Sequence, residues 1–309
     1  MINIIKNQKS KIKNCIVFVL FFALQGCYED YIKDFDYTAV FFGAQQPLRT
    51  LVSRVDQDEL VFRIGVGLGG VRENVKGYEV KYMLAPELLS IIDGADKLKL
   101  LPANCYTIEN DDDFTFYIHA GRVIGDCQVR INKNAFVALE GSLDVTWALP
   151  LRLLSTTADS IQYEKDWTII AIKYIDEHSG FYYCRGSQST NVPISVEVEY
   201  YNDDWSQNSV RTLTTISPTE FNMTGMGAIN SGITAADHLK IILEDGIVSL
   251  ETRAGNTNII EDLGSTYDAE NKIFELNYKY TKDGVTYTVS EQLKLRQDPE
   301  LELRFETWQ

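Results

Sequence analysis

Residues 274–295 read FELNYKYTKDGVTYTVSEQLKL, and this stretch decides the fold class of the chain. On both sides of Asp283-Gly284, aromatic, aliphatic and β-branched residues alternate with polar ones. Such alternation is typical of a strand with one buried face, and an Asp-Gly pair favours a two-residue hairpin turn. The stretch therefore predicts two antiparallel strands, Phe274–Thr281 and Val285–Leu295.

The same pattern continues through the rest of the chain. Short runs rich in Val, Ile, Tyr, Phe and Thr alternate with Gly, Asn and Asp turns, and no segment keeps a helical period for long. The sequence therefore predicts an all-β protein with one short helix at Ala85–Ile92. The other expected strands are Ala39–Phe42, Leu60–Gly67, Tyr78–Met83, Phe114–Ile118, Cys127–Ile131, Thr146–Leu154, Thr168–Tyr174, Ile194–Tyr201, Val210–Ser217, Leu239–Leu243 and Ile247–Thr252.

The chain is long enough for two domains. It has 309 residues, 45% of them hydrophobic, which is more than one typical β-sandwich needs. The polar run Asp176–Gly186 (DEHSGFYYCRG) follows a long strand and predicts a turn at the domain boundary. We expect a β-sandwich over residues 37–177, and hairpin-connected strands, as in meanders and small barrels, over residues 178–309.

The N-terminus has the pattern of a bacterial lipoprotein signal. Four lysines precede the apolar run IVFVLFFAL (16–24), which is too short to span a membrane, and Gln25-Gly26-Cys27 follows. The alternative is a buried N-terminal helix that ends at a chance cysteine, but residues 1–24 have no amphipathic period. We expect residues 1–26 to be removed, Cys27 to carry the lipid, and residues 27–36 to form a tether.

The charge of the chain argues against some partners. With 44 acidic and 29 basic residues, the formal net charge is −15. Removal of residues 1–26 takes four basic residues, which leaves 25 basic against 44 acidic residues and a net charge of −19. Such a surface repels phosphate backbones and anionic lipid headgroups. We therefore expect no nucleic-acid partner, and membrane contact only through the lipid.

Cys105, Cys127 and Cys184 are the other cysteines of the expected mature chain, and none belongs to a C-x-x-C pair. A Cys105–Cys127 disulfide could join two neighbouring strands of an exported protein. Buried free thiols are the alternative, and the sequence leaves both open.

One acidic cluster is a weak candidate for a metal site. Asp111, Asp112 and Asp113 are adjacent and precede an expected strand, so we interpret them as a solvated turn. The alternative is a calcium site, which would need further oxygen ligands from another loop. No other pattern predicts a metal or a cofactor.

Motifs for nucleophilic catalysis or phosphate binding are not evident. His119, His178 and His238 have no Gly-x-Ser-x-Gly neighbour, and we interpret them as surface or turn residues. The glycine-rich run Gly65–Gly70 lacks a following Lys-Ser/Thr, so a strand-edge bulge or a turn explains it better than a phosphate loop.

Trp205 is the candidate for ligand binding, because it lies in a plainly polar loop between two expected strands. Sugar rings pack their C–H faces on exposed aromatic rings, while carboxylates and amides bond the hydroxyl groups. Tyr201, Asn202, Asp203 and Asp204 are the candidate partners of Trp205. The alternative is that Trp205 folds back to cap the end of the barrel.

The other tryptophans have simpler interpretations. Trp147 and Trp167 stand in alternating strands and are expected in the core. Trp308 is the penultimate residue, where either a terminal strand buries it or it contacts a partner.

Several motifs of the first half occur in the order known from one family. This half resembles the Bacteroidetes DUF1735 domain over about residues 30–175. The motifs are Tyr37–Phe42 (YTAVFF), Gln46–Leu51 (QPLRTL), Gly69-Gly70-Val71 with Asn74, Leu101-Pro102, Cys105–Ile108 (CYTI), Leu149–Leu153 (LPLRL) and Asp159–Ile161 (DSI).

The second half resembles the DUF4361 domain that often follows DUF1735, through Gly180–Tyr183 (GFYY) and Ser217–Phe221 (SPTEF). The resemblance implies an immunoglobulin-like β-sandwich and then a β-barrel-like domain of the lipocalin or calycin type. It also implies a surface lipoprotein linked to outer-membrane glycan-uptake proteins. The acidic run Tyr28–Tyr31 behind Cys27 is consistent with surface export.

These observations favour a non-catalytic surface lipoprotein that binds glycan or assists polysaccharide capture. Some DUF1735 relatives are fused to a glycoside hydrolase, but the D-x-x-D-x-D-x-E run of the family 18 type is missing here. We therefore expect no enzymatic activity and no cofactor. The alternative is an adhesin or assembly subunit that binds a protein through its β domains.

Overall fold

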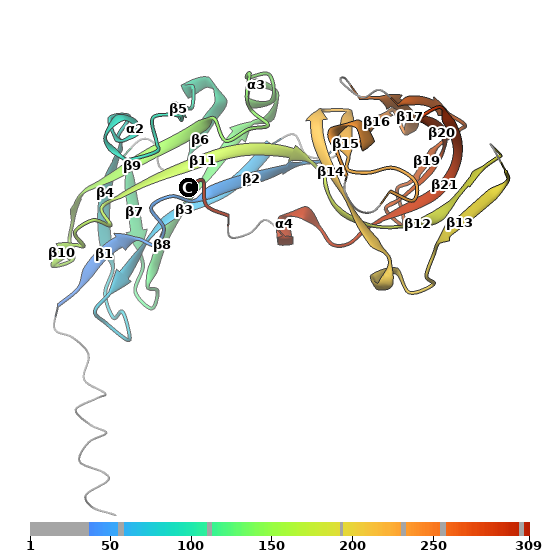
Figure 1. Cartoon of the computed structure of the whole chain (residues 1–309). Helices are drawn as coiled ribbons and strands as arrows, with labels where there is room; N and C mark the ends of the chain where they lie inside the picture. Colours follow the sequence, from blue (N-terminus) through green and yellow to red (C-terminus); the bar gives the residue numbers. More distant parts are fainter. Residues whose placement is uncertain are drawn as a thin grey trace, which may run out of the picture.

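A computed structural model shows two β-rich domains side by side (Figure 1). It describes residues 37–54, 59–109, 113–191, 194–229, 233–253, 258–302 and 306–309. Strands dominate both domains, which confirms the prediction of an all-β fold. Cys27, the expected lipid carrier, lies outside the described residues.

The first domain is a sandwich of two sheets, in which antiparallel pairs predominate. One sheet contains, in spatial order, β10 (Ser160–Ile161), β1 (Ala39–Phe42), β3 (Glu59–Gly69), β8 (Ile124–Asn132) and β6 (Tyr106–Ile108). The other contains β2 (Leu48–Ser53), β11 (Trp167–Asp176), β9 (Trp147–Thr156), β4 (Tyr78–Leu84) and β7 (Thr115–Ile118), with β5 (Lys99–Leu100) paired to β9.

Alternation along the strands places the core between these sheets. In β3, every second residue points inward, and burial of this apolar area stabilises the sandwich by about 25 cal/mol per Å². Phe42 of β1 meets Phe116 of β7 edge to face across the two sheets, with ring centroids 6.2 Å apart. The inward side chains of β3 are Leu60, Phe62, Ile64, Val66 and Leu68.

The second sheet of the sandwich is covered on both faces around β9 and β11. Its outer face carries Ala148, Ile169 and Ala171, which pack under the short helix α2 (Leu88–Ile91) and its flanking turns. Because both faces are covered there, β11 has the continuous buried run 168–172 and β9 the run 148–151, whereas β4 alternates.

Residues 306–309 follow the second domain in the chain but lie on this outer face of the first domain (Figure 1). The Trp308 amide donates to the Gln46 carbonyl at 3.2 Å, and its indole Nε1 donates to the Ile169 carbonyl at 2.6 Å. Trp308 is only 5% exposed, so of the two interpretations its burial is confirmed. The chain therefore crosses between the domains twice.

The second domain is one ten-stranded sheet that curls into a nearly closed barrel. Its strand order is β17 (Ile247–Thr252), β16 (Leu239–Glu244), β15 (Glu220–Met223), β14 (Ser209–Ser217), β12 (Gly180–Thr190), β21 (Val285–Leu295), β20 (Ile273–Lys282) and β18 (Ile259–Asp262). Two strands lie off this path, β13 (Val196–Tyr200) beside β12 and β19 (Thr266–Asp268) beside β20.

Strand β12 corrects the prediction of a turn over Asp176–Gly186. The turn ends at Ser179, and β12 runs between β14 and β21 from Gly180 onward. Tyr182 and Cys184 point into the barrel and are buried, which is the period-two pattern of a strand. The outward residues Phe181 and Tyr183 are aromatic like the inward Tyr182, so the run FYYC has no polar–apolar alternation that would reveal the strand.

The glycine-rich run is also a strand. Its residues 65–69 belong to β3, and only Gly70, with φ +89°, forms a turn. The expected strand-edge bulge or turn is therefore confirmed at Gly70 alone. The outward glycines let the ring of Phe41 lie close to β3, because a Cβ at Gly67 would be 3.1 Å and one at Gly69 3.3 Å from that ring.

Helices are few and short. The helix expected at Ala85–Ile92 is a single turn, α2, and α3 (Lys133–Val137) and α4 (Pro299–Glu302) are similar in length. The 3₁₀ turns are η1 (Ala103–Cys105), η2 (Trp205–Gln207) and η3 (Ala235–Asp237). Among the residues that the structure describes, no helix is long and apolar enough to span a membrane.

The three described cysteines are buried free thiols, so no Cys105–Cys127 disulfide forms. Burial raises the pKa of Cys127 to about 11 and that of Cys184 well above its usual range. Trp147 and Trp167 are half-buried and pack at the margin of the first-domain core rather than at its centre.

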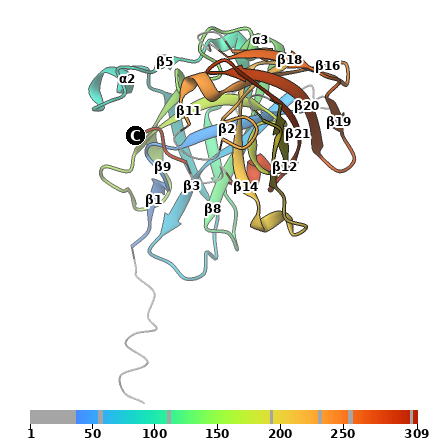
Figure 2. The ribbon, with the colours of Figure 1, turned by 45° about the vertical axis from the view of Figure 1, so that its right-hand side comes forward.

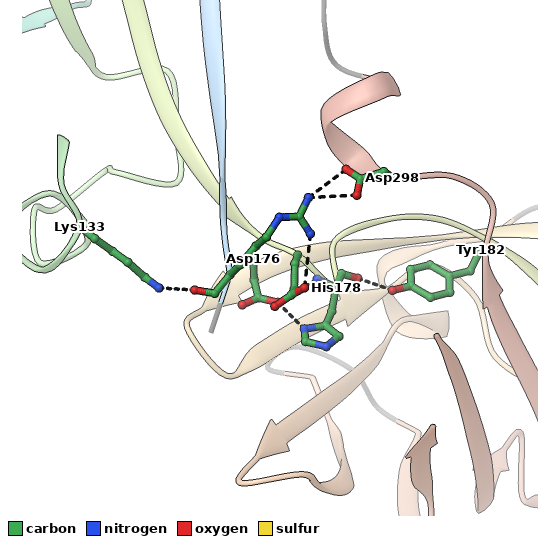
Figure 3. Close-up of polar contacts among 7 residues, drawn as sticks. Lys133, Asp176, His178, Tyr182 and Asp298 are labelled. Carbon is green, nitrogen blue, oxygen red and sulfur yellow. Dashed lines mark hydrogen bonds and ion pairs between the residues drawn. The ribbon is translucent and has the colours of Figure 1, made fainter. Parts of the chain in front are cut away.

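Charged residues join the two domains where β11 passes into β12 (Figure 3). The Arg54 guanidinium, 18% exposed at its side chain, lies 3.5 Å from Glu177 and 3.0 Å from Asp298. Lys133 Nζ donates to the Arg54 carbonyl at 2.6 Å. The contact thus ties the end of β2 to the connecting turn and to the segment before α4.

His178 belongs to the same junction. Its Nδ1 lies 2.6 Å from Asp176 Oδ1, and its carbonyl accepts a hydrogen bond from the Tyr182 hydroxyl at 2.7 Å (Figure 3). The imidazole packs edge-on against Tyr267, with ring centroids 4.9 Å apart. His178 is a turn residue, as predicted, but its ring is packed against Phe221, Tyr267 and Phe274 of the second domain.

Candidate functional site

A groove lies on the outer face of the barrel over β12, β21 and β20, and β13 flanks β12. Its volume is about 590 Å³. Figure 2 shows β12, β21 and β20 side by side. Because side chains alternate along a strand, the outward residues of these strands form the floor. The lining residues are Arg185, Gly186, Ser187, Glu199, Tyr201, Glu275, Asn277, Ser290, Glu291 and Gln292.

Three residues form a continuous hydrogen-bonded row across the groove. Gln292 is opposite Glu275 on one side and Arg185 on the other in the strand register. Its Nε2 donates to Glu275 Oε1 at 3.1 Å, and its Oε1 accepts from Arg185 Nε at 3.0 Å. We call Glu275, Gln292 and Arg185 the bonded row, because they satisfy one another.

A second row runs parallel to the first, two residues further along each strand. Asn277, Ser290, Ser187 and Glu199 are successive partners in the register, and we call them the open row. The Ser290 hydroxyl donates to Asn277 Oδ1 at 2.9 Å. Ser187 Oγ, the Glu199 carboxylate and Asn277 Nδ2 make no hydrogen bond with any residue that the structure describes. These three groups face the groove with their bonding capacity unused.

Aromatic rings form the wall of the groove beside Arg185. The guanidinium carbon lies 3.7 Å from the centroid of the Trp205 ring and 4.5 Å from that of Tyr201. Each such contact contributes about 0.5–1 kcal/mol at an exposed site. Tyr201 is 54% exposed, so Arg185 holds the Tyr201 ring in place while much of that ring meets solvent.

The Trp205 ring is not open to solvent, as a ring that packs on a sugar would have to be. It is half-buried in η2, and both Arg185 and Lys294, whose Nζ is 5.5 Å from the ring centroid, lie over its ring. Trp205 therefore supports Arg185 and Tyr201 and does not line the groove.

The polar residues of the Trp205 loop mainly bond one another. Asp204 Oδ1 accepts from the Ser206 amide at 3.0 Å, and Asn202 Oδ1 accepts from the Asp204 amide at 2.9 Å. Asn208 Nδ2 donates to the Asn202 carbonyl at 2.9 Å, and the Asp203 carbonyl faces the Arg185 guanidinium at 3.5 Å. Of the five predicted candidates, only Tyr201 lines the groove.

A buried polar cluster supports the floor from inside the barrel. Glu291, 2% exposed, accepts from the Tyr200 hydroxyl at 2.9 Å and from the Tyr278 hydroxyl at 2.8 Å. Burial and the charge of Glu291 raise the pKa of both tyrosines, so both keep the proton that they donate. Gly186 is required above this cluster, because a Cβ there would be 2.3 Å from the Ser290 carbonyl oxygen and 2.7 Å from Glu291 Cβ.

The weak metal candidates do not form a cluster in the part of the chain that is described. Asp111 and Asp112 lie outside the described residues. Asp113 is a turn residue, whose carboxylate accepts from the Thr115 amide at 3.1 Å and from the Tyr117 hydroxyl at 2.6 Å. The Tyr117 hydrogen bond lowers the pKa of Asp113. No group of three His, Cys, Asp or Glu side chains suited to a metal occurs among the described residues.

His119 and His238 lie away from the groove. His119 follows β7 in the first domain, where its carbonyl accepts from Asn74 Nδ2 at 3.1 Å. His238 lies between η3 and β16 with Nδ1 at 2.8 Å from Arg253, and burial lowers its pKa. Neither histidine lines the groove.

Comparison with known proteins finds a family match in the first domain. A family model described as an N-terminal domain and related to DUF1735 matches residues 34–160. No curated protein matches the chain.

Solved structures of Bacteroides proteins are similar in fold. A protein of unknown function from Bacteroides ovatus is 19% identical, with 85% of this chain and 95% of that chain covered at a TM-score of 0.65. A multidomain protein including DUF1735 from Bacteroides ovatus is 11% identical (84% and 94% covered, TM-score 0.42). An auxiliary nutrient binding protein from Bacteroides thetaiotaomicron is 14% identical (80% and 89% covered, TM-score 0.41). The first of these likenesses shows the fold.

Proposed function

We propose that this chain is a lipid-anchored cell-surface protein that binds glycan through the groove of its second domain, without catalysis of its own. The observation that supports this most is the Arg185 stack, which fixes the exposed Tyr201 ring beside two rows of polar side chains. A ring held in place loses little freedom when it binds, so more of the contact energy becomes affinity.

The groove suits the two surfaces of a sugar. A pyranose presents a flat C–H face, which the exposed Tyr201 ring can cover, and a rim of hydroxyl groups, which both donate and accept hydrogen bonds. The open row supplies a carboxylate acceptor at Glu199, an amide donor at Asn277 and a hydroxyl at Ser187. No covalent chemistry is needed for this recognition.

The N-terminal sequence supports the proposed location. The signal over residues 1–26 and the lipid on Cys27 would anchor the protein in the outer membrane, facing outward. The DUF1735-related domain would then act as a spacer, and the DUF4361-like domain would present the groove beside glycan-uptake proteins. The double chain crossing and the Arg54 contacts would keep the groove in a fixed orientation on this spacer.

An array of plant, host and microbial polysaccharides tests the proposal, with the full chain purified in detergent micelles. Tyr201→Ala is expected to lower the affinity about tenfold, because aromatic contacts dominate such sites. Tyr163→Ala is the matched control, since Tyr163 is 86% exposed on the first domain and should be replaceable without loss. Equal binding by all three proteins would remove the groove as the site, and no binding by the wild type would remove glycan as the ligand.

A protein partner is the second candidate, and the exposed edge of β13 favours it. β13 pairs with β12 on one side, and no strand that the structure describes pairs with its other side. Val196 and Val198 are each 43% exposed on this edge strand, which can accept a strand from another chain. Val198→Lys would weaken such a contact and leave glycan binding unchanged.

A further inference from the structure

The two rows of the groove differ in what they offer to a ligand. In the bonded row, Gln292 is held between Glu275 and Arg185, so neither its amide nitrogen nor its amide oxygen is free of a partner. In the open row, Ser187 and Glu199 have no hydrogen-bond partner among the residues that the structure describes. Ligand hydroxyls can therefore bond the open row without breaking any protein contact.

The charges in the groove are unequal. Glu199 and Glu275 are exposed and lie at its two sides, on β13 and β20, with β12 and β21 between them. Three strand intervals place β13 and β20 roughly 14 Å apart, so a ligand that lies across the floor meets both carboxylates. Arg185 is the only cation among the lining residues.

That single cation is already in contact with protein groups. Its guanidinium is stacked against Tyr201 and Trp205, its Nε bonds Gln292, and Nη1 lies 3.5 Å from the Asp203 carbonyl. These hydrogen bonds leave other N–H groups of the guanidinium, so an anionic ligand that paired with Arg185 would use those groups and would lie in the same groove as Glu199 and Glu275. The same ligand would approach Glu199, whose carboxylate forms no ion pair with any residue that the structure describes.

We propose that the groove selects neutral glycans, and that Glu199 and Glu275 exclude chains that carry carboxylate or sulfate groups. This inference rests on the proposed function and adds the class of ligand. Glu199 is the main specificity-determining residue, since it accepts hydrogen bonds from neutral hydroxyl groups and repels a negative charge at the same place. Rejection by a like charge is an efficient source of specificity, because it costs the correct ligand nothing.

The test compares each glycan with its own charged form, so that shape stays constant. Amylose, galactomannan and a β-glucan are immobilised beside preparations in which the primary C6 hydroxyls are oxidised to carboxylates. The full chain in detergent is titrated on each pair at low and at high salt. Glu199→Gln keeps the size of the side chain and removes its charge, and Glu73→Gln makes the same change on an exposed glutamate of the first domain.

The wild type is expected to bind at least one neutral glycan about tenfold more tightly than its oxidised form at low salt, with a smaller ratio at high salt. Glu199→Gln should reduce the ratio to about threefold, Glu275→Gln should reduce it less, and Glu73→Gln should leave it unchanged. Equal affinity of the wild type for both forms, or an unchanged ratio in Glu199→Gln, would overturn the inference and leave glycan binding in place. Absence of binding to every pair would overturn the proposed function, and the inference with it.

Discussion

The outward faces of β3 and β12 make an instructive comparison, because both strands bury one side in a core and expose the other. On β3 the outward residues include Gly67 and Gly69, over which the Phe41 ring lies, with Lys165 Nζ 5.4 Å from that ring. On β12 they include Arg185 and Ser187, which line a groove. Both faces combine a cation with an aromatic ring, but the first arrangement covers backbone and the second presents side chains.

The difference shows where a binding surface arises in such a fold. Inward residues of both strands follow the same alternation, since each must fill a core. The outward residues are free to vary, so glycines with a covering ring give a closed surface. Polar residues beside a stacked tyrosine give a groove.

Of the changes proposed here, Gly186→Val is expected to disrupt the groove face of β12 most severely. The new side chain would meet the Ser290 carbonyl and Glu291 at less than contact distance, so β12 and β21 could not keep their register. We expect the free energy of unfolding to fall by about 3 kcal/mol or more, measured by urea denaturation. Gly43→Ala is the control, because nothing lies within 4 Å of that Cβ, and its stability should stay near that of the wild type. A Gly186→Val protein of normal stability would show that the floor is less tightly packed than described.

Phe41→Ala would open the covered face of the first domain. The half-buried ring packs over β3, so its removal should cost about 1–2 kcal/mol of stability. Glycan affinity on the same polysaccharides should not change, because Phe41 is in the other domain. A loss of glycan binding without a loss of stability would assign a binding role to this face and contradict the comparison.

Arg185→Lys is expected to have the smallest effect of the three substitutions. It tests whether the Arg185 guanidinium positions the Tyr201 ring. Lysine keeps the charge but loses the planar group that contacts Tyr201 and Trp205 and bonds Gln292. We expect glycan affinity to fall about threefold, with stability nearly unchanged. An affinity equal to that of the wild type would mean that the Tyr201 ring does not depend on the guanidinium.

Much of the fold could be predicted because alternation is a local property. Val285–Leu295 was predicted with the bounds of β21, and Phe274–Thr281 lies within one residue of β20 at each end. β12 was missed because its outward residues Phe181 and Tyr183 are aromatic like the inward Tyr182, so no polar–apolar alternation reveals the strand. The pairing of β12 with β21, more than 100 residues further along the chain, has no local signal.

The groove was harder to predict from the sequence, because long-range strand pairing assembles it. Tyr201 could be selected as an aromatic residue in a polar segment. Glu275, Asn277, Ser290 and Gln292 stood at the polar positions of the two hairpin strands, but only the strand register brings them beside Arg185. Trp205 was selected on the same grounds as Tyr201, and the structure places its ring under a cation.

Hydrogen exchange of the full chain, with and without the neutral polysaccharide that it binds most tightly, would locate the ligand most directly. Amides of the edge strand β13 and of residues 200–208 should exchange fast in the free protein, because few of them are paired inside the sheet. The ligand is predicted to slow exchange there and to leave β1, β3 and β8 unchanged. Protection confined to the first domain, or binding without any protection around β13, would contradict a glycan site in this groove.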